Sequence, residues 1–356
     1  MDIDRLLKAA VRGGASDVIL KIGEIPRFRF HGILVPLSDG HPISTEIMDQ
    51  WIAKILPEHL QDRKKTGDCD FAYQSPSGHR FRVNLFKQRS FYGLVLRVVS
   101  NHVRSLEELQ MPSILHRLVH EKRGLILVTG ATGSGKSTTI AALIQKINEE
   151  RAAHIVTIED PIEINFKDFR STINQREIGQ DTVSFGAALR AVLRQNPDVI
   201  FVGELRDQET TETALMAAET GHLVLSTLHT SNAVESFIRI LNFFPPHAHS
   251  HLRQVLSQAL VAVISQRLVR TIDGKSMASA VEVLMSNTNV KETILNATDF
   301  TSLHRIISEG QDTYGMLSFD QCLFDLYQAG IISHEEALAQ ASQRDNLLLR
   351  IRGVGA

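Results

Sequence analysis

Residues 125–139 read Leu-Ile-Leu-Val-Thr-Gly-Ala-Thr-Gly-Ser-Gly-Lys-Ser-Thr-Thr. The apolar run 125–128 predicts a buried strand. The spacing from Gly130 to Ser137 matches G-x-x-x-x-G-K-[ST], in which glycines leave backbone N–H groups free to surround phosphate oxygens. Apolar residues at 140, 143, 144 and 147 then recur with helical spacing, so a helix begins where its N-terminus can face an anion. The stretch therefore predicts a strand, loop and helix that hold a nucleotide phosphate.

The side chains of this loop suit the same chemistry. Lys136 would neutralise charge on the β- and γ-phosphates, and the Ser137 hydroxyl would ligate Mg²⁺. A glycine-rich turn without a ligand is the alternative, but the flanking strand and helix favour a phosphate site. We therefore expect ATP and Mg²⁺ as cofactors. The predicted nucleotide-binding residues are Gly130, Ala131, Thr132, Gly133, Ser134, Gly135, Lys136, Ser137 and Thr138.

The composition predicts a soluble globular protein. A length of 356 residues suggests about two domains, and 43% of the residues are hydrophobic. The 38 basic residues are balanced by 40 acidic ones, so no basic excess indicates a nucleic-acid partner. The acidic start and the absence of a long apolar run argue against a signal peptide and a membrane span. Cys69 and Cys322 are far apart, which argues against a disulfide framework and indicates the cytoplasm.

Residues 1–100 are predicted to form a small α+β domain. Apolar spacing over 6–11 predicts an opening helix, and residues 47–56 predict a second. Strands are expected at 16–21, at 28–34 with a turn at Gly32, at 80–86 and at 92–99. Residues 101–112 mix polar residues with leucines and a proline, so we interpret them as a linker with a short helix.

The rest of the chain, 113–356, is predicted to be a second domain. Strand-like runs at 125–128, 155–158, 199–202 and 223–225 alternate with helical ones. This alternation predicts a largely parallel sheet with crossover helices. Residues from about 290 to 356 have helical patterns only, so we expect a helical C-terminal tail.

Acidic and histidine side chains follow the predicted strands. Ligands of parallel α/β sheets lie beyond the carboxyl ends of the strands, and ATP hydrolysis needs carboxylates near water and Mg²⁺. Glu204 follows strand 199–202 and has the position of a Walker B acid, which would hold Mg²⁺ directly or through water. Glu163 follows strand 155–158, and His222 and His229 flank strand 223–225. Surface acids and structural histidines are the alternatives.

Five motifs together resemble one known family. They are the loop 130–137, the segments Ile158-Glu-Asp-Pro-Ile-Glu163 and Asn174-Gln-Arg-Glu-Ile-Gly179, and the stretches 193–206 and 221–230. This combination resembles the type II/IV secretion ATPase superfamily. Within it, the match is strongest with the twitching-motility pilus retraction ATPases, the PilT family and its PilU relatives, and it covers nearly the whole chain.

The resemblance implies an α/β protein with an N-terminal PAS-like α+β domain and a RecA-like P-loop ATPase core. It implies a homohexamer that hydrolyses ATP to power type IV pilus retraction. Its partners would be an inner-membrane platform protein and the pilin machinery, with a peripheral location on the cytoplasmic side. By motif, Glu163 is implied to be the general base and Glu204 the Walker B acid, while His222 and His229 sense the γ-phosphate and Arg82 and Arg97 reach a neighbouring subunit's nucleotide.

One segment departs from the family pattern. Retraction enzymes usually carry Ala-Ile-Arg-Asn-Leu-Ile-Arg at the start of the tail, whereas this chain has Lys291 and Leu295 at the two arginine positions. An accessory paralogue, PilU-like or of another type II/IV secretion system, therefore remains an alternative to the principal retraction motor. A DNA-directed RecA-like motor is disfavoured by the balanced charge and the 6% aromatic content. A non-motor regulatory ring that binds nucleotide and a partner but hydrolyses the nucleotide slowly is disfavoured by Glu163 and Glu204.

Overall fold

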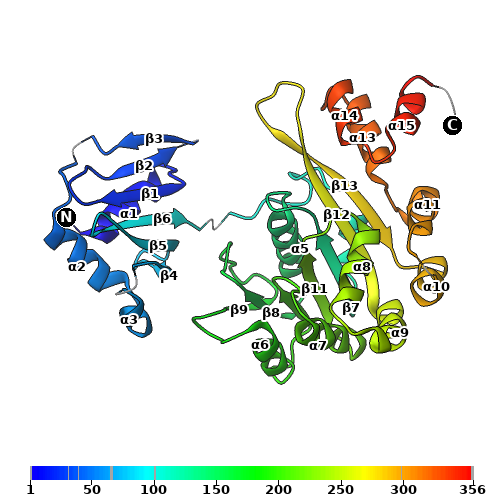
Figure 1. Ribbon diagram of the computed structural model, residues 1–356, viewed down its shortest axis with the longest axis horizontal. Helices are drawn as coiled ribbons and strands as arrows, with labels where there is room; N and C mark the ends of the chain where they lie inside the picture. The colour runs from blue at the N-terminus through cyan, green and yellow to red at the C-terminus, as the bar shows by residue number, and fades with distance from the viewer. Residues whose placement is uncertain are drawn as a thin grey trace. The chain divides into compact units, whose positions relative to one another are not determined.

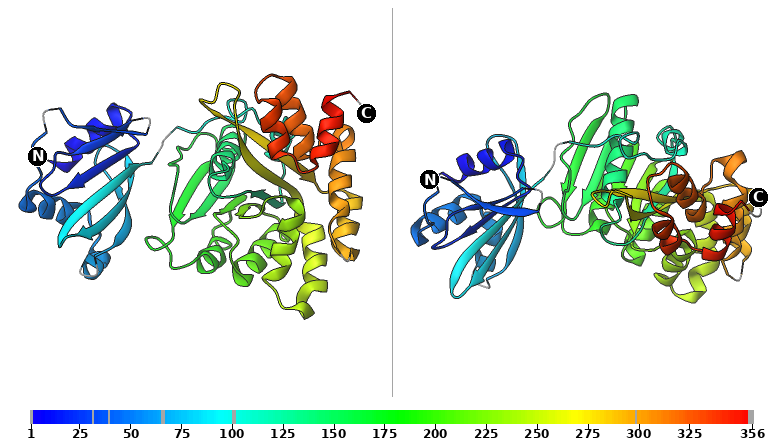
Figure 2. Two further views of the ribbon diagram at one scale, coloured as in Figure 1. Left: turned by 45° about the horizontal axis from the view of Figure 1, so that its top comes forward. Right: turned by 90° about the horizontal axis from the view of Figure 1, so that it is seen from above.

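The structure is a computed structural model that describes residues 2–30, 32–38, 40–64, 67–99, 102–297 and 299–353. The chain divides into two compact units. The first comprises Met1–His102 with Glu163–Asn165, and the second comprises Val103–Ile162 with Phe166–Ala356. Each unit has its own sheet and its own helices (Figures 1 and 2), and the expected α/β fold class is confirmed.

The first unit is built on a six-stranded antiparallel sheet with the order β3-β2-β1-β6-β5-β4. Alternation of side chains decides which face is buried: Phe81, Val83 and Leu85 of β5 are in the core, and the residues between them lie on the opposite face. The elements are α1 (Ile3–Arg12), β1 (Asp17–Lys21), β2 (Arg27–Phe30), β3 (Ile33–Pro36), α2 (Thr45–Ile55), η1 (Glu58–Leu60), α3 (Gln61–Lys64), β4 (Cys69–Gln74), β5 (Arg80–Gln88) and β6 (Phe91–Val98).

A row of charged side chains crosses the other face of this sheet. Strand register places Arg29, Asp17, Arg97 and Arg82 opposite one another on β2, β1, β6 and β5, so Arg82 and Arg97 share one face. Arg97 Nε donates to Asp17 Oδ1 at 3.0 Å, and Arg29 Nε lies 3.3 Å from Asp17 Oδ2. Burial opposes ionisation of Asp17, but hydrogen bonds from Arg97 and Ser16 outweigh it and hold its pKa below the usual value.

The second unit is built on a seven-stranded sheet with the order β13-β12-β7-β11-β10-β8-β9, in which β13 alone is antiparallel to its neighbour. Helices cover both faces (Figures 1 and 2). Leu125 and Leu127 of β7 pack on the side of α6–α9, and Ile126 and Val128 pack on the side of α4 and α5. A strand buried on both faces is apolar throughout, which explains the run that opens the phosphate motif.

Strands and helices of the second unit alternate up to β11, except that β9 follows β8 without a helix between them; α8 and α9 then precede a β12–β13 hairpin and a helical tail. The tail helices α13–α15 share a core with β12 and β13, to which Val269, Ala280, Phe319 and Leu323 contribute. The elements are α4 (Ile114–Leu118), β7 (Gly124–Thr129), α5 (Lys136–Glu150), β8 (His154–Glu159), β9 (Thr172–Glu177), α6 (Phe185–Val192), β10 (Val199–Val202), α7 (Gln208–Glu219), β11 (Leu223–Leu228), α8 (Ala233–Asn242), η2 (Pro246–Ala248), α9 (His249–Ala259), β12 (Leu260–Arg270), β13 (Met277–Met285), α10 (Thr288–Asn296), α11 (Ser302–Glu309), α12 (Gln311–Tyr314), α13 (Phe319–Gln328), α14 (His334–Gln340) and α15 (Arg344–Ile351).

The short helix expected within 101–112 does not form in the residues described there. Residues 106–110 make turns. Ser105 and Glu108 exchange hydrogen bonds as at a helix start, with Ser105 N donating to Glu108 Oε2 at 2.7 Å. Gln110 then adopts a φ of 53°, and Pro112 follows, so the chain cannot continue as a helix. Within the described ranges, every helix is too short or too polar to cross a bilayer.

The charged row predicts a pH-dependent contribution to stability. Asp17→Asn should lower the free energy of unfolding by about 1 kcal/mol at pH 7, because the arginines lose their carboxylate but remain partly exposed. Because the pKa of Asp17 is lowered on folding, its stabilisation is present at neutral pH and is lost as the pH falls through that value. Urea unfolding followed by the fluorescence of Trp51, the single tryptophan and 3% exposed, measures the loss.

The control is Asp70→Asn on the exposed side of β4, where Asp70 accepts a hydrogen bond from Asn84 at 2.9 Å. This change should stay within about 0.5 kcal/mol of the wild type. Equal effects of the two substitutions, or a loss for Asp17→Asn that does not shrink in acid, would contradict the assigned role of the row.

Candidate active site

The loop between β7 and α5 depends on two glycines. A Cβ on Gly130, whose φ is 149°, would lie 2.3 Å from Ser134 Oγ and 2.6 Å from the carbonyl oxygen of Gln266. Gly135 has a φ of 94° and immediately precedes the first helical residue. A side chain at position 130 would therefore clash, one at position 135 would strain the backbone, and the loop closes tightly at the N-terminus of α5.

Lys136 begins α5 and is only 8% exposed. Its Nζ donates to the carbonyl oxygens of Gly130 at 2.7 Å and Ala131 at 2.9 Å, and it lies 3.5 Å from His229 Nδ1. The loop thus holds a buried cation with acceptors that a phosphate oxygen can replace. Among the described residues, the hydroxyl of Ser134 in the same loop is buried without a hydrogen-bond partner, which fits a donor to phosphate.

Acidic and basic side chains from three strand ends meet beside Lys136. His229 follows β11, and its Nε2 lies 3.4 Å from Glu204 Oε1, which follows β10. Arg206 Nε donates to Glu204 Oε2 at 2.7 Å, and Arg206 Nη1 lies 3.3 Å from Asp160 Oδ2, after β8. The hydrogen bond to Glu204 raises the pKa of Arg206. Lys136, His229 and Glu204 therefore form one connected cluster at the carboxyl edge of the sheet, as the rule for parallel sheets predicts.

The donors beside the loop fit a magnesium ion. Ser137 lies on the exposed first turn of α5, and the side chain of Glu204 is 18% exposed. Hydroxyl and carboxylate oxygens, together with phosphate oxygens, are the ligands that Mg²⁺ prefers. When bound, the ion would neutralise charge that develops on the phosphates.

The structure separates His222 from His229, although the sequence motif contains both. His222 precedes β11 at its amino end, where its Nδ1 lies 3.0 Å from the carbonyl oxygen of Ala217. The six residues of β11 separate it from His229 by about 20 Å. A strand carries its two ends to opposite edges of the sheet, so His222 lies away from the phosphate loop of its own chain, and its implied part in sensing the γ-phosphate stays a prediction.

Three of the predicted catalytic residues are not in the second unit. Glu163 groups with the first unit, to which Arg82 and Arg97 also belong. The second unit by itself therefore supplies Lys136, Ser137, Glu204 and His229.

Two residues of the cluster, Asp160 and Arg206, were missed by the sequence analysis. Their signal is position, since both lie just beyond the carboxyl ends of buried strands, like Glu204.

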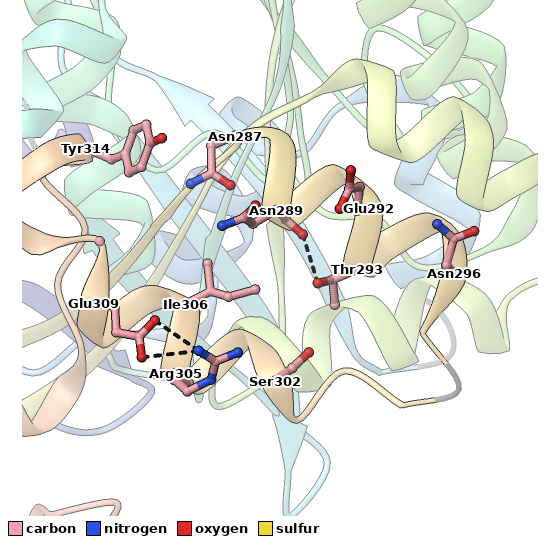
Figure 3. Close-up of a pocket in the computed structure, with 11 residues that line it drawn as sticks. Asn287, Asn289, Glu292, Thr293, Asn296, Ser302, Arg305, Ile306, Glu309 and Tyr314 are labelled. Atoms are coloured by element: carbon pink, nitrogen blue, oxygen red, sulfur yellow. Dashed lines mark hydrogen bonds and ion pairs between the residues drawn. The ribbon is translucent and has the colours of Figure 1, made fainter.

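A separate cavity of about 700 Å³ lies in the tail (Figure 3). Polar side chains of α10, α11 and α12 line it, among them Asn289, Glu292 and the Arg305–Glu309 ion pair. The altered positions Lys291 and Leu295 are exposed on α10 but do not line it. The sequence departure in α10 therefore changes the outer surface of the helix.

The sheet, the loop and the carboxylate cluster define a RecA-like P-loop ATPase. The profile of the type II/IV secretion system protein family matches residues 1–329. The chain belongs to this family, and it is one of its ATPases.

Similar proteins match along almost their whole lengths. The chain is 39% identical to the type IV pilus ATPase PilU of Pseudomonas aeruginosa, covering 99% of this chain and 92% of that protein. It is also 39% identical to the type IV pilus retraction ATPase PilT of the same organism, covering 97% of this chain and 100% of that protein. The crystal structure of the pilus retraction motor PilT with bound ADP superposes with a TM-score of 0.87 and 41% identity, covering 97% of this chain and 98% of that chain.

The cluster predicts a specific kinetic effect at Glu204. Glu204→Gln should lower kcat about 10²-fold or more with little change in KM for ATP, because the amide loses the negative charge that faces His229 and that would face a bound ion. Steady-state hydrolysis by the purified protein measures this. The control is Glu212→Gln on α7, the same change on an exposed helix face. A normal kcat for Glu204→Gln would return Glu204 to a structural role.

Proposed function

We propose that this protein is a hexameric motor that uses ATP hydrolysis to retract type IV pili. The observation that carries the proposal is the likeness to the retraction motor PilT along nearly the full length of both chains. The phosphate loop and the cluster around Glu204 supply the chemistry that such a motor needs.

In the proposed cycle, Lys136 and the loop N–H groups bind the β- and γ-phosphates, and Ser137 and Glu204 hold Mg²⁺. Glu163 acts as the general base for the attacking water. His229 senses the γ-phosphate, since its two ring nitrogens face Lys136 and Glu204 at 3.5 and 3.4 Å. When phosphate binds Lys136, the interaction with His229 Nδ1 changes, and this change can reach Glu204 through the same ring.

In the assembled ring, Arg82 and Arg97 complete the site of a neighbouring subunit. They share one face of the first sheet, and their side chains are 42% and 66% exposed. An arginine supplied to a phosphate site in trans can contribute ~10³–10⁵ in rate. The proposed partners are the inner-membrane platform protein and the pilin machinery, with the protein in the cytoplasm and peripheral to the membrane. We expect no nucleic-acid partner, because the basic residues do not outnumber the acidic ones.

An accessory ATPase beside a principal motor is the second candidate. Lys291 and Leu295 are exposed on α10 where retraction enzymes usually carry arginines, so the two surfaces would present different charge to a partner. The 39% identity to both PilT and PilU of one organism favours neither candidate.

Deletion of the gene in the organism that encodes the protein tests the proposal. A principal retraction motor predicts excess surface pili and no twitching, because pili are assembled but not withdrawn. Complementation with the wild type should restore twitching, and complementation with Lys136→Ala should not. Loss of surface pili would instead indicate an assembly function, and retained twitching with reduced force would indicate the accessory candidate.

Shared sites predict that two inactive variants complement each other. Lys136→Ala and the double variant Arg82→Ala, Arg97→Ala should each be inactive. When they are co-assembled, some interfaces pair an intact loop with intact arginines, so partial ATPase activity should return. The matched control is co-assembly of Lys136→Ala with the triple variant Lys136→Ala, Arg82→Ala, Arg97→Ala. No subunit of that mixed ring has an intact loop, so no interface can be active. Wild-type rings doped with Lys136→Ala establish whether partial rings turn over; if they do, inactive mixed rings of confirmed mass would contradict shared sites.

A further inference from the structure

Glu282 is a buried carboxylate that the proposed cycle does not use. It lies on β13 and is 3% exposed. Its Oε1 accepts a hydrogen bond from the backbone N–H of Ala233 at 2.9 Å. Ala233 is the first residue of α8, so the carboxylate satisfies one of the free N–H groups at the start of that helix. Burying a carboxylate is costly, and this arrangement indicates a specific use for it.

Glu282 is also connected to the root of the phosphate loop. Register places it opposite Ser265 on β12, and Ser265 opposite Thr129 on β7. Thr129 Oγ1 donates to Ser265 Oγ at 3.1 Å, and Ser265, opposite Glu282, lowers the pKa of that carboxyl. Thr129 and Ser265 are both fully buried. Thr129 immediately precedes Gly130, so a row of polar side chains leads from the loop to Glu282.

The other end of the connection is the segment that carries His229. Residues 229–232 join β11 to α8, which lies against β12 (Figure 1). Asn232 and Glu235 cap this helix locally, accepting from Glu235 N and Ser231 N, each at 2.9 Å. These caps move with the helix. Glu282 instead joins the start of α8 to strand β13. A carboxylate at a helix N-terminus is further stabilised by the helix dipole.

We propose that Glu282 is a positioning residue for His229. By fixing the N-terminus of α8 to the sheet, it keeps the segment 229–232 where the His229 ring lies between Lys136 and Glu204. The row through Ser265 links that placement to the phosphate loop. The inference rests on the proposed phosphate-sensing function of His229.

The charges around Glu282 make this anchor sensitive to pH near neutrality. Burial raises the pKa of Glu282 to about 7, against hydrogen bonds from Ala233 and Ser265 that lower it. Among the charged groups described around it, Arg267 on β12 lowers the pKa and Asp320 on α13 raises it. The ionised form is the stronger acceptor for the Ala233 N–H. Protonation below about pH 7 should therefore weaken the anchor.

The test is the pH profile of ATP hydrolysis by the full-length assembled protein, between about pH 5 and pH 9. The wild type should lose kcat as the pH falls through about 7. Glu282→Gln keeps the shape and an acceptor oxygen but cannot ionise. Its kcat should be reduced about 3- to 10-fold at high pH, with little change in KM. The decline of kcat below about pH 7, which is the acid limb of the profile, should disappear.

A control and a second variant separate positioning from simple loss of structure. Glu235→Gln changes an exposed carboxylate on the same helix and should keep the wild-type limb. Ser265→Ala removes a polar side chain that lowers the pKa of Glu282, so it should move the acid limb to higher pH. It also serves as the test if Glu282→Gln fails to fold.

Stability should change in the opposite direction to activity. The raised pKa means that the wild type loses stability as the pH rises through about 7, because the buried carboxylate must ionise. Glu282→Gln should therefore have a higher Tm than the wild type at high pH, with the difference closing in acid. A lower kcat together with a higher Tm is a result that a purely structural function does not produce.

The outcomes also separate this inference from the function of His229. If His229→Ala abolishes turnover while Glu282→Gln keeps the wild-type rate and acid limb, positioning by Glu282 is wrong and the function of His229 stands. If His229→Ala turns over normally, the sensing function fails and the inference fails with it. If Glu282→Gln lowers both kcat and Tm, the positioning function is also wrong, because loss of structure then explains the loss of activity.

Discussion

The ammonium group of Lys136 is the charge around which the active site is arranged. At 8% exposure it cannot rely on water, so the carbonyl oxygens of Gly130 and Ala131 accept its hydrogen bonds. This requires a loop that folds back on itself, which in turn requires a glycine at 130. The cation is therefore already in place for an anion before any nucleotide binds. Preorganisation of this kind avoids the cost of rearrangement when phosphate charge develops.

The parallel sheet brings the partners of that cation together. Glu204 and Arg206 follow β10 and are joined at 2.7 Å, and Arg206 reaches Asp160 after β8 at 3.3 Å because the two strands end at one edge. The second unit thus contains the phosphate loop and the carboxylate of Glu204. The arginines of the first unit lie in a row with Asp17, which orients Arg97.

The β12–β13 hairpin joins functions that are far apart in the sequence. One part of it lies beside β7 and carries the row from Thr129 to Glu282. Another part, with Val269 and Ala280, shares a core with Phe319 and Leu323 of α13. A change at the phosphate loop and a load on the tail therefore act on the same pair of strands. Close packing makes such a hairpin a physical connection between hydrolysis and the helices that would meet a partner.

Local patterns in the sequence determined the phosphate loop, the four buried parallel strands of 125–128, 155–158, 199–202 and 223–225, and the shared face of Arg82 and Arg97. Each of these depends on neighbours in the chain or on a period of two, which a sequence displays directly. The strands β4, β9, β12 and β13 were not predicted, and neither were the contacts of Arg206 with Asp160 or of Glu282 with Ala233. Only the tertiary structure placed His229 at the loop and His222 at the opposite edge. Strand order, direction and register decide which distant residues meet, and no local pattern encodes them.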